Sequence, residues 1–174
     1  MKYIIFVCNG NIHRSVIAEA CFRNIIKRHK IDKDIIIDSY GIQGTVGTKL
    51  PKKKQLSEYT KEWGAAKPTL DKLKIDINNH YFQMISEDVI KKADLIIAMD
   101  DKVYKKAENS LIKQFPKYKN KMYCFCEFII DNEIIKDPSG NDDTKAHEQI
   151  ITKICHTLNN RLDDILQLLF TNKC

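Results

Sequence analysis

The stretch that decides the fold runs from Tyr3 to Ala20 and reads YIIFV, then CNGNIHRS, then VIAEA. A short apolar run leads directly into Cys8, five residues separate this cysteine from Arg14, and the hydroxyl of Ser15 follows at once. The apolar run predicts a buried strand, and the pattern after Ser15 predicts a helix. The stretch is therefore expected to form a strand, a tight loop and a helix, with a thiol and a guanidinium at the two ends of the loop.

A loop of this kind suits a phosphate-like dianion. Several backbone N–H groups point into one concavity, and the positive end of the helix dipole adds to their field. Arg14 would add two parallel donors, and the same field favours the nucleophilic thiolate form of Cys8. The residues expected to bind phosphate are Asn9, Gly10, Asn11, Ile12, His13, Arg14 and Ser15.

Three of these residues have properties that such a loop requires. Gly10 permits backbone angles that a side chain would forbid. Asn11 tolerates a left-handed conformation and can tie the loop together through its amide. Ser15 can donate a hydrogen bond to the thiolate. The alternative is a buried strand cysteine beside a surface arginine, and the register of Gly, Asn and Ser with these two residues argues against it.

Residues Cys8 to Ser15, followed by AEA, resemble the signature C-x-G-N-x-x-R-S of the low-molecular-weight protein tyrosine phosphatases. The resemblance is strong over residues 1–42, moderate over 84–170 and weak between them. It implies a single phosphatase domain over residues 1–174 with a loop insertion at about 45–62. It also implies hydrolysis through a phosphocysteine intermediate and no cofactor.

The resemblance further implies a general acid. A thiolate that attacks a phosphomonoester needs an acid to protonate the departing oxygen, and the same group can then act as base for the hydrolytic water. In the family this acid is an aspartate followed by proline ahead of the last helix, and Asp137-Pro138 matches it. Taken alone, an Asp-Pro pair would be an ordinary turn. The catalytic residues are expected to be Cys8, Arg14 and Asp137.

Other positions match residues that the family places around the loop. Ser39 and His80 match positions that hydrogen-bond the loop asparagine, so Asn11 is expected to bond to Ser15, Ser39 and His80. Asp100 matches an aspartate near the edge of the site.

The chain departs from the family pattern at residues that would flank the substrate. Ser139-Gly140 follows the Asp-Pro pair where many tyrosine-specific members carry aromatic residues, which leaves the preference for phosphotyrosine open. His13 replaces a cysteine that can form a protective disulfide with the nucleophile, and Val16 replaces the usual proline. Trp63 is a candidate for the aromatic residue that the family carries beside the active-site mouth.

The insertion itself has two interpretations. Tyr59 could flank a phosphoaryl ring, and the cluster at residues 52–54 could attract acidic peptides through its three lysines. The alternative is a solvated loop without a role in substrate choice.

The whole chain predicts an α/β fold with a four-stranded parallel sheet, helices on both faces and the phosphate-binding loop after the first strand. Strands are expected at residues 3–7, 35–37, 94–99 and 122–125. Helices are expected at 15–29, 68–74, 86–92, 101–115 and 142–170, with a loop from 41 to 67.

The composition narrows the class of protein. No apolar segment is long enough to span a membrane, and the run after Lys2 is too short for a signal peptide. We therefore expect a cytoplasmic protein without membrane contact, as a monomer or weak dimer. The net charge of +6 comes mainly from scattered lysines and, without a basic stripe interleaved with aromatic residues, does not predict nucleic-acid binding. The expected partner is a phosphorylated protein or peptide, and the loop is expected to hold phosphate or sulfate.

The cysteines are expected to be reduced, because the chain lacks a signal segment and would use one thiolate as nucleophile. Combining the C-x-C pair with nearby histidines gives no usual zinc spacing, so no metal is expected. The residues considered are Cys8, Cys21, Cys124, Cys126, Cys155, Cys174, His147 and His156.

Four functions remain to be weighed. The first is hydrolysis of phosphotyrosine in proteins. The second is protein arginine phosphatase activity, but members with that activity carry threonine where this chain has Ile12. The third is thiol-dependent arsenate reduction, which needs relay cysteines that are absent from residues 100–115. The fourth is a phosphate-binding module without turnover, which the combination of Cys8, Arg14 and Asp137 argues against.

Overall fold

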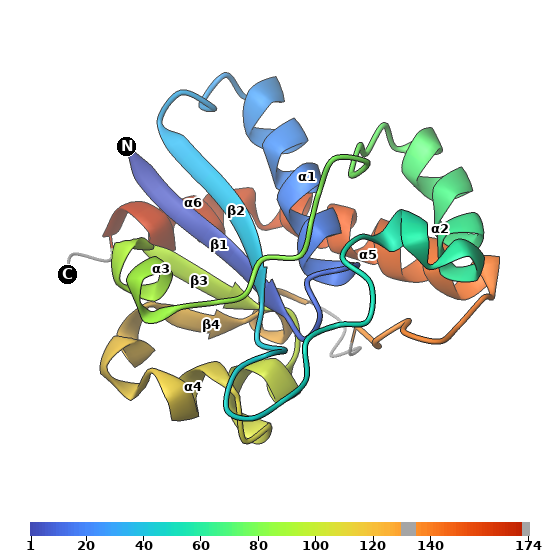
Figure 1. Ribbon diagram of the computed structural model, residues 1–174. Coiled ribbons are helices and arrows are strands. Elements are labelled where there is room, and N and C mark those ends of the chain that lie inside the picture. The colour runs from blue at the N-terminus through green and yellow to red at the C-terminus, as the bar shows by residue number, and fades with distance from the viewer. Residues whose placement is uncertain (130–134, 172–174) are drawn as a thin grey trace.

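The computed structural model describes residues 1–129 and 135–171, which contain a four-stranded parallel sheet (Figure 1). The strand order is β2-β1-β3-β4, so β1 lies inside the sheet with its neighbours on opposite sides. Ligands of open α/β sheets bind at the carboxyl ends of the strands where the order reverses in this way. The predicted fold is confirmed, with strands β1 Lys2–Cys8, β2 Ile35–Gly41, β3 Leu95–Ala98 and β4 Met122–Cys124.

Helices cover both faces of the sheet because the side chains of β1 alternate between them. Ile4 and Phe6 pack into one core cluster, and Ile5 and Val7 pack into the other. Strands buried on both faces need a continuous apolar sequence, which β1 and β3 have. The first cluster includes residues of α1 Arg14–Arg28, α5 Thr144–Asn160 and α6 Leu162–Thr171, and the second includes residues of α3 Glu87–Lys92 and α4 Leu111–Gln114.

The segment after β2 is more ordered than its composition predicts. A 3-10 turn at Leu56–Glu58 leads into α2, Thr60–Lys72, which contains Pro68. The predicted loop to residue 67 and short helix at 68–74 are therefore wrong. The helix forms because Ala65, Ala66, Thr69 and Leu70 lie at helical spacing and are buried, and α2 packs against α5.

Two predicted helices are interrupted. The helix expected over 101–115 is a π-helical turn, Lys102–Lys106, followed by α4, and between them Asn109 donates from Nδ2 to the Ile42 carbonyl at 2.8 Å. A 3-10 segment, Pro116–Lys121, then leads into β4. The long C-terminal helix is broken at Arg161, whose Nε donates to the Phe128 carbonyl at 3.1 Å. Each break occurs where a side chain hydrogen-bonds a carbonyl of a distant segment.

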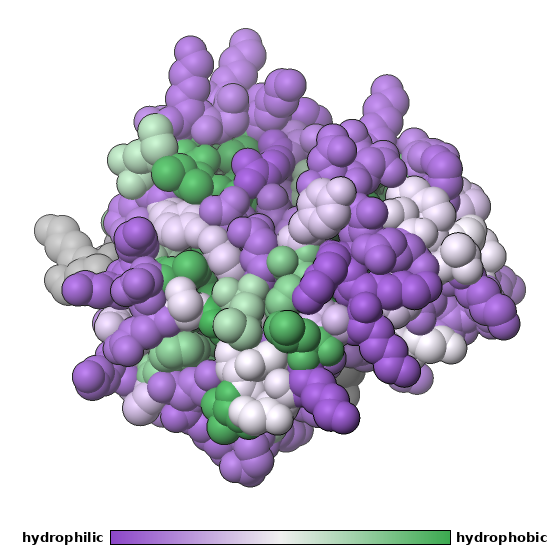
Figure 2. Space-filling view, in the orientation of Figure 1, coloured by the Kyte–Doolittle hydropathy of each residue, from purple (hydrophilic) through white to green (hydrophobic). Residues whose placement is uncertain are grey.

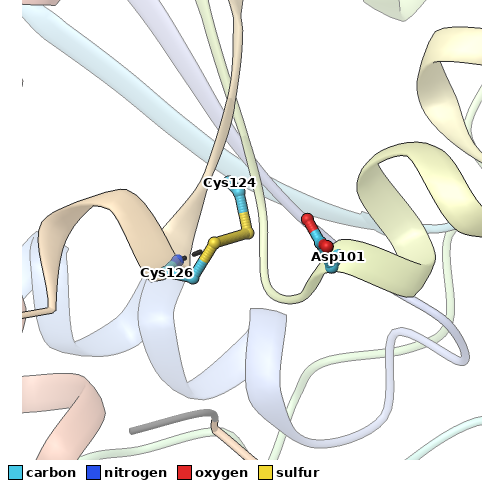
Figure 3. A group of neighbouring side chains, drawn as sticks. All are labelled: Asp101, Cys124 and Cys126. Carbon is cyan, nitrogen blue, oxygen red and sulfur yellow. Dashed lines mark hydrogen bonds between the residues drawn. A yellow bond between two sulfur atoms is a disulfide. The ribbon is translucent and has the colours of Figure 1, made fainter. Parts of the chain in front are cut away.

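The expectation of reduced cysteines is wrong for four of them. Disulfides join Cys21 of α1 to Cys155 of α5, with Cα atoms 5.7 Å apart, and Cys124 to Cys126. The second pair spans the end of β4 and the 3-10 turn Phe125–Phe128, beside the carboxylate of Asp101 (Figure 3). Sulfurs joined in a disulfide are not thiolates, which are the form that binds zinc. Cys174 lies outside the described residues.

The face of the protein drawn in Figure 2 is predominantly polar, and its hydrophobic residues form separate patches toward the upper left, near the middle and below it. Within residues 1–129 and 135–171, no helix combines the length and apolar character needed to cross a membrane.

Candidate active site

Cys8 ends β1, and the loop that follows it returns to the start of α1 at Arg14. Its side chain is buried, and its Sγ accepts hydrogen bonds from the backbone N–H of Asn11 at 3.2 Å and from the hydroxyl of Ser15 at 3.0 Å. A thiolate accepts hydrogen bonds and donates none, so both contacts are compatible with an ionised sulfur.

The left-handed residue of the loop is Asn11, with φ of 48°, in agreement with the tolerance expected of asparagine. Gly10 has no such angle, and a Cβ there would meet the end of the flexible Gln43 side chain at 3.2 Å and Ile12 Cγ1 at an ordinary contact distance of 3.6 Å. The conformational requirement predicted for Gly10 is therefore wrong. Glycine is needed instead at Gly41, where a Cβ would lie 2.8 Å from the carbonyl oxygen of Asn9.

The Asn11 side chain is fully buried and has four hydrogen-bond partners in three segments of the chain. Its Nδ2 donates to the hydroxyls of Ser15 at 3.1 Å and Ser39 at 2.9 Å. Its Oδ1 lies 3.0 Å from Nε2 of His80 and accepts from the backbone N–H of Gln83 at 2.8 Å. The three side-chain partners are those that the family resemblance implies. The fourth is a backbone group, which leaves no signal in the sequence.

His80 is placed to donate to this amide. Burial lowers the pKa of His80, against the opposing charge of Glu19, whose Oε2 lies 3.8 Å from Nδ1. Because the oxygen of Asn11 can only accept, Nε2 of a neutral His80 carries the proton.

Arg14 is 2% exposed and is held between two carboxylates. Its NH1 donates to Asp100 at 2.5 Å, and its NH2 donates to Asp137 at 2.8 Å. Burial by itself would lower the pKa of Arg14, but the charges of Asp137, Cys8 and Asp100 outweigh this effect and raise it. Asp100 is fixed in turn, since its Oδ1 accepts from the backbone N–H of Val103 at 2.7 Å. The structure therefore brings Cys8, Arg14 and Asp137 together at the carboxyl end of β1.

A cavity of about 330 Å³ opens above Cys8. Its volume lies at the small end of the range for ligand pockets. Residues of the loop, including Ile12, and residues of the Asp137 segment line it. The segment after β2 contributes Pro51, Lys52, Leu56, Tyr59 and Glu62.

The aromatic residue in the wall is Tyr59. Trp63, the residue expected there, packs against the core cluster that includes α1 and α5. Tyr59 and Trp63 are one helical turn apart, and the backbone N–H of Trp63 donates to the Tyr59 carbonyl at 2.8 Å. Their spacing in sequence gave no means of telling which ring would face the cavity.

Two further wall residues were missed by sequence reasoning. Glu62 accepts from the backbone N–H of Gly140 at 2.6 Å and so contacts the Asp137 segment. His147 lies against His13 of the loop rather than near the cysteines, with 3.0 Å between His13 Nε2 and His147 Nδ1.

Comparison with known proteins identifies the family. The family described as low molecular weight phosphotyrosine protein phosphatase matches residues 3–169. This chain belongs to that family. Membership agrees with the loop at Cys8 and with the resemblance found in the sequence.

Relatives of this low molecular weight phosphatase differ in the substrates for which they are named. A protein-arginine-phosphatase of Bacillus subtilis (strain 168) is 25% identical over 138 residues, which is 79% of each chain. The low molecular weight protein-tyrosine-phosphatase YfkJ of the same organism is 27% identical over 164 residues, covering 91% of this chain and 94% of the relative.

Solved structures show the same fold. The low molecular weight protein tyrosine phosphatase of T. tengcongensis aligns with a TM-score of 0.74 at 23% identity, over 94% of this chain and 99% of that one. A YwlE mutant from Bacillus subtilis aligns with a TM-score of 0.72 at 23% identity, over 95% and 99% of the two chains. At this identity the likeness concerns the fold alone.

Proposed function

We propose that this phosphatase hydrolyses phosphomonoesters through a phosphocysteine intermediate and acts on phosphotyrosine in proteins. The observation that carries the proposal is the single cavity in which Cys8 Sγ, the Arg14 guanidinium and the Asp137 carboxyl meet. A nucleophile, a fixed cation and an acid within one pocket are the groups that phosphoryl transfer to a thiolate requires.

Each group has a distinct role in the proposed reaction. The thiolate of Cys8 attacks phosphorus, and Arg14 donates two hydrogen bonds to the phosphoryl oxygens, where charge accumulates. Asp137 gives its proton to the departing oxygen, and its carboxylate then takes a proton from the water that attacks the phosphocysteine. The hydroxyl of Ser15, 3.0 Å from Sγ, stabilises the thiolate when it leaves.

Asp137 is well placed for this exchange of roles. Its side chain is 48% exposed, whereas that of Arg14 is 2% exposed. The acid therefore lies at the entrance of the cavity, where the leaving group departs and water arrives, and the arginine lies at the base, where the phosphoryl group binds.

The walls of the cavity favour an aryl ester. Ile12, Leu56 and Tyr59 present apolar or aromatic surface, which suits a phenyl ring more than a charged alkyl chain. Tyr59 thus supplies the aromatic contact that Ser139-Gly140 cannot supply. The exposed cluster Lys52–Lys54 adjoins this wall and would attract acidic peptides.

Dephosphorylation of arginine is the second candidate. The carboxylate of Glu62 lines the cavity and could accept hydrogen bonds from a phosphoguanidinium group, and one relative is named as a protein-arginine-phosphatase. Two features argue for the ester: Glu62 already accepts from Gly140, and Ile12 stands where arginine-specific members carry threonine.

One experiment separates the candidates. A single peptide is prepared with phosphotyrosine or phosphoarginine at the same position, and kcat/KM is measured for the wild type, Cys8→Ser and Ile12→Thr. We expect the wild type to prefer phosphotyrosine by about tenfold or more, corresponding to roughly 1.4 kcal/mol. Ile12→Thr should reduce the preference for phosphotyrosine over phosphoarginine, and Cys8→Ser should be inactive on both peptides. A wild type that prefers phosphoarginine, or activity that survives Cys8→Ser, would contradict the proposal.

A further inference from the structure

A buried pair of histidines joins the phosphate-binding loop to α5. Nε2 of His13 lies 3.0 Å from Nδ1 of His147, and the two rings meet edge-on with centroids 5.0 Å apart. His13 is 8% exposed and His147 is fully buried. The proposed chemistry uses neither ring, and buried polar groups are costly unless their hydrogen bonds are made.

The proton positions follow from the far end of the pair. Nε2 of His147 lies 2.8 Å from the carbonyl oxygen of Asn141, which can only accept, so this nitrogen donates. In a neutral His147, Nδ1 is then the acceptor, and His13 donates to it from Nε2. His13 Nδ1 is left as a buried atom without a hydrogen-bond partner among the described residues. The hydrogen bonds thus run in one direction, from His13 through His147 to Asn141.

The Asn141 carbonyl, at which these hydrogen bonds end, belongs to the segment that carries Asp137. Most residues from 136 to 143 are exposed, so packing alone does not fix them. Outside contacts are few: Arg14 with Asp137, Glu62 with Gly140, His147 with Asn141, and an exposed ion pair in which Lys61 Nζ lies 3.8 Å from Asp142. Inside the segment, the backbone N–H of Asn141 donates to the Pro138 carbonyl at 2.9 Å, which links the His147 contact to the turn after Asp137.

We propose that His13 and His147 are positioning residues that hold the Asp137 segment over the phosphate-binding loop, so that the general acid meets the departing oxygen. The inference rests on the proposed function, in which Asp137 is that acid. The pair connects the two parts of the site directly: His13 immediately precedes Arg14, and Asn141 lies four residues after Asp137.

The proposal predicts a selective defect. Cys8 is held by Asn11 and Ser15, and Arg14 keeps its contact with Asp100 even if Asp137 moves; none of these three partners depends on His147. Losing the link should therefore leave phosphate binding and nucleophilic attack intact while displacing the acid. Small displacements of a catalytic group cost up to about 10²-fold in rate. The loss should be confined to esters whose leaving group needs a proton.

The kinetic test uses two esters and matched variants. His147→Phe keeps a ring but no hydrogen bond, whereas His147→Gln offers both a donor and an acceptor. His156→Gln, on the exposed side of the same helix, is the control. In His147→Phe we expect kcat/KM for phenyl phosphate, whose leaving group needs a proton, to fall about tenfold or more. The kcat/KM for 2,4-dinitrophenyl phosphate, whose leaving group does not, should change less than about threefold. His147→Gln should recover most of the loss on phenyl phosphate. Equal losses on both esters, no loss on either, or a Gln variant as impaired as Phe would overturn the proposal.

A second measurement does not depend on catalysis. Hydrogen exchange of the amides of residues 139–143 should be faster in His147→Phe than in the wild type or His147→Gln. Equal exchange in the three proteins would overturn the link even if the enzyme is active. A wild type that hydrolyses neither ester would instead contradict the proposed function and leave the exchange result to decide the link. If His147→Phe does not fold, His147→Leu, which is smaller and also lacks both hydrogen bonds, replaces it in both measurements.

Discussion

His13 gives the folded protein a sensitivity to acid that a single substitution can isolate. Burial, together with the nearby His147 and Arg14, lowers the pKa of His13 from 6.5 to about 3. The unfolded chain exposes the ring to water and restores the higher value. Between these two pKa values the unfolded state binds a proton that the folded state does not, so the free energy of unfolding falls as the pH falls through this window.

The change in the free energy of unfolding can be calculated from the one proton that the His13 ring takes up in the unfolded state. Between pH 7 and pH 5 the protonation of the unfolded ring alone removes about 2 kcal/mol from the free energy of unfolding. Other groups add to the total, but they are common to the wild type and to a variant that lacks this ring. His13→Gln keeps an N–H donor for Nδ1 of His147 and titrates at neither pH.

Urea unfolding at pH 7 and pH 5 provides the assay. The drop in the free energy of unfolding between the two pH values should be smaller by about 2 kcal/mol in His13→Gln than in the wild type. His29→Gln serves as control, because this ring is exposed at the end of α1 and meets water in both states. An identical drop in the wild type and His13→Gln would refute the reasoning.

Three predictions follow from the proposed site. Cys8 is the one free thiol among residues 1–129 and 135–171, so iodoacetate at mildly acidic pH should inactivate the enzyme, and phosphate should protect it. Modification confined to alkaline pH would contradict a thiolate nucleophile. Asp137→Asn keeps an oxygen for the Arg14 contact but cannot supply the proton, so turnover on poor leaving groups should fall by about 10²-fold or more, and an unchanged rate would remove Asp137 from the mechanism. The kcat/KM for acidic phosphopeptides should fall with added salt, and replacing Lys52, Lys53 and Lys54 by alanine should flatten this dependence; an equally steep salt dependence in the variant would show that the attraction lies elsewhere.

The strand, loop and helix at the start of the chain were predictable because their determinants are local. An apolar run buried on both faces, a loop of fixed length and a left-handed asparagine are all properties of adjacent residues. Cys8, Asn11 and Ser15 contact one another within a few residues, so their arrangement follows once the loop forms. The parallel sheet with helices on both faces followed from the alternation of strand and helix patterns along the chain, because parallel strands need crossover connections.

The parts that could not be predicted depend on contacts between distant segments. His147 and Glu62 reach the site because α5 and α2 pack beside it, and the residues next to them in the sequence give no sign of this role. The disulfide between Cys21 and Cys155 spans a sequence separation of 134 residues and likewise depends on the packing of α1 against α5. Composition favoured reduced thiols, but the proximity of the two cysteines is set by the fold.

The structure shows that residues 45–62 are not a separable insertion, because the segment continues into α2. From the sequence it reads as an insertion that could be removed to test its role in substrate choice. In the structure it ends inside α2, whose buried residues pack against α5, the helix that carries His147. Tyr59 is the residue immediately before this helix, and its carbonyl accepts from Trp63 in the first turn. Deleting the segment would therefore disturb α2, the Glu62 contact and the position of Asp137 together, and a change in substrate preference would have no single cause. Substituting Tyr59 alone leaves α2, the Glu62 contact and the position of Asp137 in place and removes, besides the ring, only its contacts with Lys53, whose backbone N–H donates to the Tyr59 hydroxyl at 3.3 Å. That change therefore tests more directly than the deletion whether the ring selects an aryl substrate.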